Sequence, residues 1–110
     1  MEKKYFNKVL LINETFIVDH SVFDEWITFF KNNYMKNLQE LSSVNDVLLS
    51  KVRGDYNPDG ENYALQFKIN EMEYHKFKTD KKLLEIRKVI DEKFRNRFAS
   101  FVTVLEIQNI

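Results

Sequence analysis

Residues 63–73, YALQFKINEME, decide the fold. In the first part of this stretch large apolar side chains alternate with small or polar ones: Tyr63, Leu65, Phe67 and Ile69 against Ala64, Gln66 and Lys68. This alternation predicts a strand with one apolar face and one partly polar face. The second part, from Asn70 to Glu73, has the pattern of a capping box, which predicts that a helix begins there.

The segment before this stretch predicts the other half of a hairpin. Residues 44–53 are rich in apolar and β-branched side chains but alternate only loosely. Residues 54–61 are predicted to be the hairpin loop, because both glycines and the only proline of the chain lie there, at Gly54, Pro58 and Gly60. Their confinement to one loop also excludes a glycine-rich phosphate-binding loop elsewhere in the chain.

The segment after this stretch predicts a broken helical region and then a last strand. Apolar residues recur at spacings of three and four at Leu83, Ile86, Ile90 and Phe94, which is typical of a helix with one buried face. Thr79 and Asp80 form a second capping site, so we expect a bend or break near residue 80. Residues 98–107 are again β-branched and aromatic, which predicts a strand.

The N-terminal half predicts one strand and one helix. Residues 8–19 contain no glycine or proline and are rich in β-branched residues, so they predict a strand. The Ser21 hydroxyl or the Asp19 side chain is the predicted cap of the following helix, with Asp24 and Glu25 at the positive end of the helix dipole. The apolar stripe of that helix comprises Phe23, Ile27, Phe30, Tyr34 and Leu38.

The predicted order is strand, helix, strand, strand, helix, strand. This is the split βαβ arrangement of an α+β, ferredoxin-like domain, with a four-stranded antiparallel sheet and both helices on one face. We expect one domain over residues 1–110, with residues 1–7 flexible. The first and last strands are apolar on both faces, so the face without helices needs a cover. The sequence therefore predicts a homodimer through the open sheet face.

Composition excludes several classes of protein. The chain of 110 residues has no cysteine, which excludes disulfides and thiolate zinc sites and predicts a reduced, cytoplasmic protein. The apolar run Val9 to Ile12 is too short for a signal peptide or a membrane span, so no membrane association is predicted. The 17 basic residues balance the 17 acidic ones, which disfavours nucleic acid as a partner. Residues 73–97 are mildly basic, which we interpret as a solvated helix surface.

Several short motifs resemble those of a family of short bacterial proteins of unknown function, which adopt the dimeric α/β-barrel form of the ferredoxin-like fold. They are Asp19-His20-Ser21-Val22 with Glu25-Trp26, Tyr63-Ala64-x-Gln66-Phe67, and Phe98-x-x-Phe101-x-Thr103-x-Leu105-Glu106. The resemblance implies this dimeric fold over nearly the whole chain. Members of the family often carry a histidine, and a proline two residues later, toward the end of the first helix, where this chain has Tyr34 and Lys36. The wider superfamily includes cofactor-free oxygenases, haem enzymes and ligand-sensing modules, so the resemblance leaves the function open.

Three residues are candidates for catalysis. His20 lies between Asp19 and Ser21, where a carboxylate can orient a general base, although a surface position beside a helix cap is the favoured interpretation. Glu14 and Glu106 are carboxylates in apolar strands, and would be candidate acids or bases if the sheet buried them inside the dimer. The alternative for both is an ion pair at a strand end or edge. Two distant histidines and no cysteine give no metal site, and no cofactor is predicted.

Three further residues are candidates for ligand binding. Arg53, Gln66 and Lys68 are polar residues that share the predicted hairpin and are able to line one sheet face. The alternative is that they are simply its solvated side. Trp26, Tyr63 and Phe67 have the spacing of core residues and are interpreted as packing.

We therefore predict a homodimeric protein of unknown biochemical role that binds a small apolar or aromatic molecule or acts as an interaction module. The first alternative is a cofactor-free enzyme of the oxygenase or isomerase kind. The second is a nucleic-acid-binding module, because ferredoxin-like sheets can stack bases on exposed aromatic side chains. A cavity that touches a carboxylate or His20 would favour the enzyme.

Overall fold

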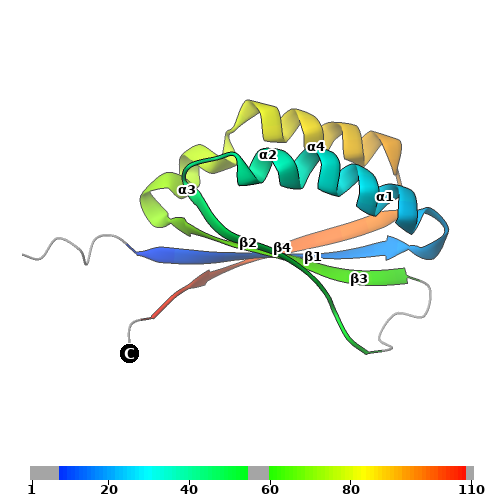
Figure 1. Cartoon of the computed structure of the whole chain (residues 1–110), viewed down its shortest axis with the longest axis horizontal. Coiled ribbons are helices and arrows are strands. Elements are labelled where there is room, and N and C mark those ends of the chain that lie inside the picture. The colour runs from blue at the N-terminus through cyan, green and yellow to red at the C-terminus, as the bar shows by residue number, and fades with distance from the viewer. Residues whose placement is uncertain (1–7, 55–59, 109–110) are drawn as a thin grey trace, which may run out of the picture.

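The computed structural model describes residues 8–54 and 60–108. The elements follow one another, as Figure 1 shows, in this order: β1 (Val9–Asp19), η2 (His20–Val22), α1 (Phe23–Phe29), η3 (Phe30–Met35), α2 (Lys36–Gln39), β2 (Val44–Lys51), β3 (Gly60–Asn70), α3 (Glu71–Lys78), α4 (Lys81–Lys93) and β4 (Phe98–Glu106). The predicted flexible segment 1–7 and residues 55–59 of the predicted hairpin loop lie outside the described residues.

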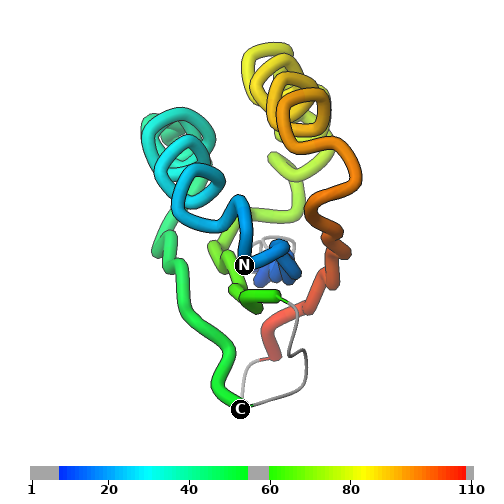
Figure 2. Tube along the Cα trace, turned by 90° about the vertical axis from the view of Figure 1, so that its right-hand side faces the viewer, coloured from blue at the N-terminus to red at the C-terminus, as the bar shows by residue number. Residues whose placement is uncertain are grey.

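The four strands form one antiparallel sheet in the order β2-β3-β1-β4. β1 is central and pairs with β3 on one side and β4 on the other, so that Glu14 lies between Leu65 and Val102. The helical segments cover one face of the sheet in two rows, α1 to α2 and α3 to α4, and leave the other face open (Figure 2). This is the predicted ferredoxin-like fold.

The alternation along β1 separates the two faces of the sheet. Every second residue from Leu10 to Val18 is buried under the helices, and the residues between them are half-buried on the open face. Along β3 the apolar positions also face the helices, and Leu65, Phe67 and Ile69 are buried. The predicted assignment of the apolar face of this strand to the core is confirmed.

Residues 20–39 are helical throughout, but the helix changes its winding along its length. Its start is capped by Asp19, whose side chain accepts the backbone N–H of Ser21 at 2.9 Å. Of the two predicted caps the structure has Asp19 and not Ser21, whose hydroxyl itself donates to Asp19 at 2.8 Å. One carboxylate oxygen of Asp19, Oδ1, accepts both of these hydrogen bonds.

The middle of this helix, η3, is a wide π-helical turn. Two asparagine side chains donate to carbonyl oxygens four residues before them, Asn33 to Phe29 at 2.9 Å and Asn37 to Asn33 at 2.7 Å. Such side-chain bonds to backbone carbonyls compete with the regular ladder of the helix. We infer that the two asparagines stabilise the wide turn.

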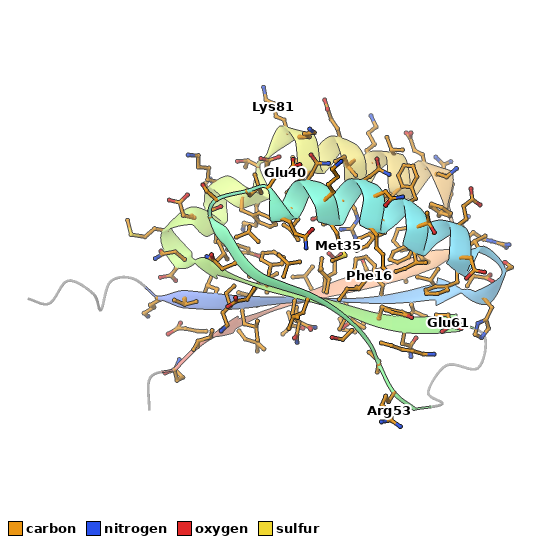
Figure 3. The ribbon with its side chains drawn as sticks, viewed as in Figure 1. Phe16, Met35, Glu40, Arg53, Glu61 and Lys81 are labelled. Atoms are coloured by element: carbon orange, nitrogen blue, oxygen red, sulfur yellow. The ribbon has the colours of Figure 1, made fainter. Side chains whose placement is uncertain are left out.

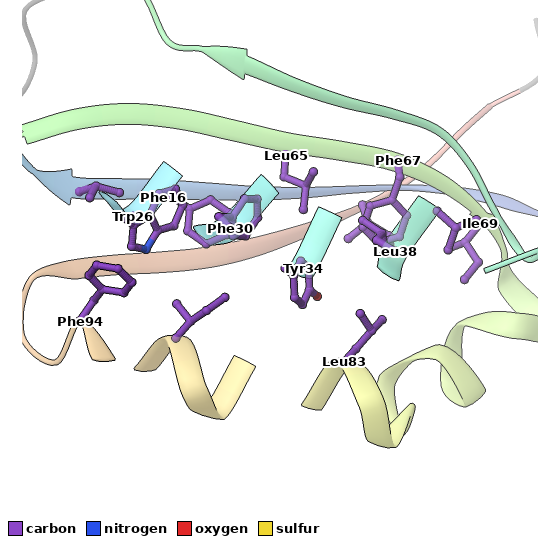
Figure 4. Close-up of a cluster of buried hydrophobic side chains, with 14 of the residues drawn as sticks. Phe16, Trp26, Phe30, Tyr34, Leu38, Leu65, Phe67, Ile69, Leu83 and Phe94 are labelled. Atoms are coloured by element: carbon purple, nitrogen blue, oxygen red, sulfur yellow. The ribbon is translucent and has the colours of Figure 1, made fainter. Parts of the chain in front are cut away.

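The wide turn keeps four buried side chains in one row. They lie four residues apart, at Trp26, Phe30, Tyr34 and Leu38. An α-helix repeats every 3.6 residues, so side chains with a spacing of four would move gradually around a regular helix and leave its buried face. Figure 4 shows these four side chains in line under the sheet. The rings of Trp26 and Phe30 are stacked at 4.8 Å, and those of Phe30 and Tyr34 at 5.3 Å. Phe16 of β1 meets this stack edge-on, with its ring centre 5.0 Å from that of Phe30 and the two planes at 66°.

The second helical region is broken where the sequence predicts. Asn70 caps α3 by accepting the backbone N–H of Met72 at 2.9 Å. Asp80 caps α4 by accepting the backbone N–H of Leu83 at 3.0 Å. Each cap satisfies a backbone donor that its helix leaves free, so two separate helices begin.

The loose alternation of β2 has a local cause. The register of β2 against β3 shifts between Asn45 and Leu48. Asp46 lies in this irregularity with a φ of 56°, in the left-handed region that aspartate tolerates better than most residues. A β-bulge adds one residue to a strand. Beyond the bulge, the positions that would have faced the helices face the open side, and the reverse, so the alternation looks irregular in the sequence.

The open sheet face carries exposed apolar side chains. Phe101 is 56% exposed, Leu105 is 46% exposed and Leu48 is 59% exposed. Phe101 lies opposite Thr15, and Leu105 lies opposite Leu11, on the side of β1 that the helices do not cover.

Over residues 8–54 and 60–108 the structure has no helix that is long and apolar enough to span a membrane.

Candidate functional site

A cavity of about 310 Å³ lies between the helix-facing side of the sheet and the helical layer. Its walls come from six elements and are mainly apolar and aromatic. They are formed by Ile12 and Glu14 of β1, Tyr34 of η3, Phe67 of β3, Tyr74, Phe77 and Lys78 of α3, Leu83, Leu84 and Arg87 of α4, and Val102 of β4.

The polar centre of the cavity is an ion pair between Glu14 and Arg87. The two terminal nitrogens of the guanidinium donate to the two carboxylate oxygens, Nη2 to Oε2 at 2.6 Å and Nη1 to Oε1 at 3.2 Å. The Glu14 side chain is 9% exposed and that of Arg87 is 23% exposed. A two-pronged pair of this kind fixes the orientation of both side chains.

Further contacts hold the guanidinium of Arg87 in place. Nη2 also donates to the Ser100 hydroxyl at 2.9 Å. The guanidinium carbon lies 5.4 Å from the ring centre of Phe16 and 5.7 Å from that of Tyr34. Burial lowers the pKa of Arg87, but its hydrogen bonds to Glu14 and the charge of that carboxylate outweigh burial and raise it above its ordinary value. Arg87 is therefore a permanent cation in this site.

Tyr34 gives the cavity a hydroxyl group that keeps its proton. Burial raises the pKa of Tyr34 to about 12, and the negative charge of Glu14 acts in the same direction. The Tyr34 phenol is consequently protonated at every physiological pH. It is suited to donate a hydrogen bond and not to act as a base.

Three aromatic side chains form one wall of the cavity. The Phe67 and Phe77 rings are 5.2 Å apart and tilted by 57°. The Tyr74 and Phe77 rings are 6.2 Å apart and nearly parallel, at 16°. The ammonium nitrogen of Lys78 lies 4.9 Å from the centre of the Tyr74 ring. The wall thus combines flat apolar surfaces with a cation, and Lys78 is exposed to solvent.

Of the three predicted catalytic residues, only Glu14 lines the cavity. His20 is half exposed at the start of the first helix, and its Nδ1 lies 2.9 Å from a carboxylate oxygen of Glu61. Figure 3 places Glu61 at the start of β3, near α1. The structure therefore does not bring His20 to the cavity.

The two predicted strand carboxylates lie on the helix-facing side of the sheet. Glu14 is opposite Val102, and Glu106 is opposite Leu10, which is buried under the helices. The condition under which we expected them to act, burial on the dimer-facing side, is not met. Glu106 is at the end of β4 and pairs with Lys8 at 3.4 Å, with nearly half of its side chain exposed.

The three predicted ligand-binding residues are not among those that line the cavity. Gln66 donates to the Asn13 side chain at 3.0 Å, and Lys68 pairs with Asp46 at 3.5 Å. Arg53 lies beyond the end of β2 and points away from the helices (Figure 3). A binding role for Arg53, Gln66 or Lys68 stays a prediction about a different part of the molecule.

No metal centre is formed by the part of the chain that the structure describes. Within residues 8–54 and 60–108 there is no group of three or more His, Cys, Asp or Glu side chains arranged to hold a metal ion. The carboxylate of Glu14 is instead occupied by Arg87.

Our sequence reasoning missed Arg87, Tyr74, Phe77 and Lys78 as site residues. For Arg87 the sequence does hold a signal. It lies four residues after Leu83 and three before Ile90, and thus on the buried stripe of α4, as Glu14 lies on the buried face of β1. Two opposite charges at core positions of different elements predict an ion pair.

Three solved structures have a fold similar to that of this chain. A protein from Caulobacter crescentus CB15, described as a putative antibiotic biosynthesis monooxygenase, matches with a TM-score of 0.70 and 12% identity over 94% of this chain and 93% of its own. SnoaB, a cofactor-independent oxygenase from Streptomyces nogalater, matches with a TM-score of 0.63 and 10% identity over 94% and 96%. A dimeric protein of unknown function and ferredoxin-like fold from Bacteroides fragilis NCTC 9343 matches with a TM-score of 0.61 and 12% identity over 88% and 96%.

At identities of 10–12% the similarity establishes only the fold. The three proteins have different descriptions: a putative monooxygenase, an oxygenase and a protein of unknown function. No curated protein matches the chain. A family model does match, and it spans residues 9–108, which is nearly the whole sequence. The chain belongs to the family described as a domain of unknown function, DUF4286.

Proposed function

We propose that this protein is a homodimer that binds a small, mainly apolar or aromatic molecule in the cavity between the sheet and the helices. The observation that carries the proposal is the cavity itself, which has apolar and aromatic walls around a fixed polar centre of Glu14, Arg87 and Tyr34. Small-molecule sites commonly have this composition and volumes of about 300–1,000 Å³. The volume of about 310 Å³ suits a ligand of one to three rings.

The helical wall of the cavity supports the same proposal. Tyr34 reaches the cavity from the π-helical turn η3. Turns of this kind cost helix stability and are frequent at functional sites. A wide turn that positions a cavity residue is in keeping with a binding function.

The proposed dimer forms through the open sheet face. Exposed apolar side chains on that face, Leu48, Phe101 and Leu105 among them, favour a cover of similar chemistry. A second copy supplies such a cover, and one of the solved proteins with this fold is described as dimeric. The chain has no cysteine, which is in keeping with a reducing compartment, and we propose a cytoplasmic location.

Titration with N-phenyl-1-naphthylamine, a neutral two-part aromatic probe whose fluorescence rises in apolar surroundings, tests the proposal. Leu84 lines the cavity and is 54% exposed, so Leu84→Trp should fill the entrance and weaken probe binding at least about tenfold. Val89→Trp is the matched control, because Val89 is 47% exposed on the same helix and does not line the cavity. Equal binding by the two variants, or none by the unchanged protein, would contradict the proposal.

A second candidate function is a cofactor-free enzyme that moves a proton. The observation that favours it is the carboxylate of Glu14 in the cavity wall, near the phenol of Tyr34. Glu14 would accept a proton from an acidic carbon of the ligand and return it to a neighbouring carbon, while the phenol donates a hydrogen bond to the intermediate anion. Deuterium uptake from D₂O by a bound ligand, lost in Glu14→Gln while ligand binding is kept, would distinguish this enzyme from a binding protein.

The nucleic-acid alternative has less support. Phe67 of β3 is 2% exposed under the helices and is not available to stack on bases. Lys68 on the open face is paired with Asp46. A gel shift that weakens steeply with salt would be needed to revive this alternative.

A further inference from the structure

We propose that the molecule held in the cavity is an anion, with one carboxylate or sulfonate group attached to an aromatic body. This inference rests on the proposed function and adds the charge of the ligand to it. It is carried by the balance and positions of the charged side chains around the cavity.

Three charged side chains line the cavity, Glu14, Arg87 and Lys78. Glu14 and Arg87 neutralise each other through two hydrogen bonds, of 2.6 and 3.2 Å. Lys78 makes no ion pair with any residue of the ranges 8–54 and 60–108, and its charge is the one left over. The lining therefore carries a net charge of +1, which an anionic ligand would balance.

Two acidic side chains outside the lining also act on its residues electrostatically, Asp80 on Tyr34 and Asp91 on Arg87, and each makes a contact of its own. Asp80 uses its side chain to accept the backbone N–H of Leu83 at the start of α4. Asp91 lies 3.9 Å from Nε of Arg87 and is mostly exposed. Neither is paired with Lys78 in the structure.

The aromatic wall sets where the anionic group would lie. The ammonium of Lys78 is over the face of the Tyr74 ring, and Tyr74 is nearly parallel to Phe77. An aromatic ligand packed against this wall would extend toward the solvent-exposed Lys78 with its polar end. The apolar body thus stays inside and the anion stays at the mouth, where it remains partly hydrated and its desolvation costs little.

A pair of probes that differ in one group tests the inference. 8-Anilinonaphthalene-1-sulfonate has the ring system of N-phenyl-1-naphthylamine and an added sulfonate. In fluorescence titrations at low salt we expect the sulfonate to bind about tenfold more tightly than the neutral probe. The difference should shrink at about 0.5 M NaCl, where exposed charges are screened.

Lys78→Met should remove this preference, so that the ratio of the two probes' dissociation constants falls to about one. Lys78 is exposed, so the variant is expected to fold, which circular dichroism checks. Lys76→Met is the matched control, because Lys76 is an exposed lysine of the same helix that does not line the cavity. Leu84→Trp should weaken both probes, because both occupy the cavity.

The outcomes separate the two proposals. Equal affinities for the two probes, or a sulfonate preference that survives Lys78→Met, overturn the anion inference while the binding function stands. Failure of both probes to bind overturns the proposed function together with this inference. A preference lost equally in Lys76→Met and Lys78→Met also overturns it, since general surface charge would then be the cause.

Discussion

Arg87 and Glu14 are charged residues at positions that the rest of their elements fill with apolar side chains. Glu14 is 7% exposed, so removal of Arg87 would leave a carboxylate without a partner inside the protein. We expect Arg87→Met to lower the free energy of unfolding by about 3 kcal/mol, because breaking a buried pair costs more than the pair contributes. Urea denaturation followed by tryptophan fluorescence measures this loss.

The control is the double variant Glu14→Leu/Arg87→Met, which removes both charges. It should be clearly more stable than Arg87→Met alone, because no buried charge is left unpaired. Losses that simply add in the double variant would show that the two residues act independently.

Tyr34 makes stability depend on pH in the alkaline range. Its pKa rises from 10.0 to about 12 on folding, so the folded state holds its proton more tightly than the unfolded state. The stabilisation is fully present below pH 10 and is lost as pH rises from 10 to about 12, by about 3 kcal/mol. Comparison with Tyr34→Phe isolates this effect, since the variant lacks the titrating phenol. Parallel stability curves for the two proteins from pH 9 to 12 would rule it out.

At the residue scale, the sequence identifies Glu14 as unusual but not its partner. Arg87 is 73 positions away, and only the pairing of β1 with β4 and the packing of α4 bring the two together. The aromatic wall was missed for a related reason. Tyr74 and Phe77 are half-buried, and in the sequence a residue at a cavity wall looks the same as one at the rim of the core.

Among the elements, α4 depends on its cap. Asp80 accepts the backbone N–H of Leu83, and we expect Asp80→Ala to cost about 1 kcal/mol of stability, the usual value of a helix N-cap. Lys81→Ala is the control, since Lys81 is the exposed first residue of the same helix. Thermal unfolding should separate the two variants by several degrees. A loss as large in Lys81→Ala would mean that helix propensity, and not the cap, is responsible.

The strands and helices follow the sequence closely because their signals are local. The alternation of residues 63–69 and the caps at Asn70 and Asp80 each lie within a few residues of the element that they define. The wide turn η3 and the bulge at Asp46 were not predicted. Both interrupt the regular spacing of apolar residues in their element. In a sequence, a regular spacing with one interruption is hard to distinguish from a weak periodicity. The spacing of four from Trp26 to Leu38 is the one signal that pointed to the wide turn.

For the whole molecule, the open sheet face predicts assembly. Phe101 is 56% exposed on that face, and Phe101→Glu should weaken the proposed dimer at least about tenfold by placing a charge among its apolar side chains. Val104→Glu is the control on the same strand, because Val104 lies opposite Ile12 on the helix-facing side. Sedimentation at micromolar concentration measures the effect. A monomer in the unchanged protein would remove the dimer from the proposal.

The order of elements was enough to predict the ferredoxin-like fold, since few chain paths connect four strands and two helical regions in this order with right-handed crossovers. The cavity was not predictable in the same way. Its walls are drawn from β1, η3, β3, α3, α4 and β4, so it exists only once all of these are packed. Glu14 is the residue that connects the sequence to the cavity: the sequence identifies it as a candidate, and the structure places it in the cavity wall.

The π-helical turn also affects how the chain tolerates changes in length. Such a turn holds one residue more than a regular turn, so it behaves as an insertion that the helix has absorbed in place. Deleting one exposed residue from it, such as Asn32, would leave a regular helix of nearly the same length. Tyr34 would then be turned relative to the sheet, while the fold around it stayed the same. The polar centre of the cavity, and the ring stack of Phe30 and Tyr34 beside it, are thus open to change by gain or loss of a single residue.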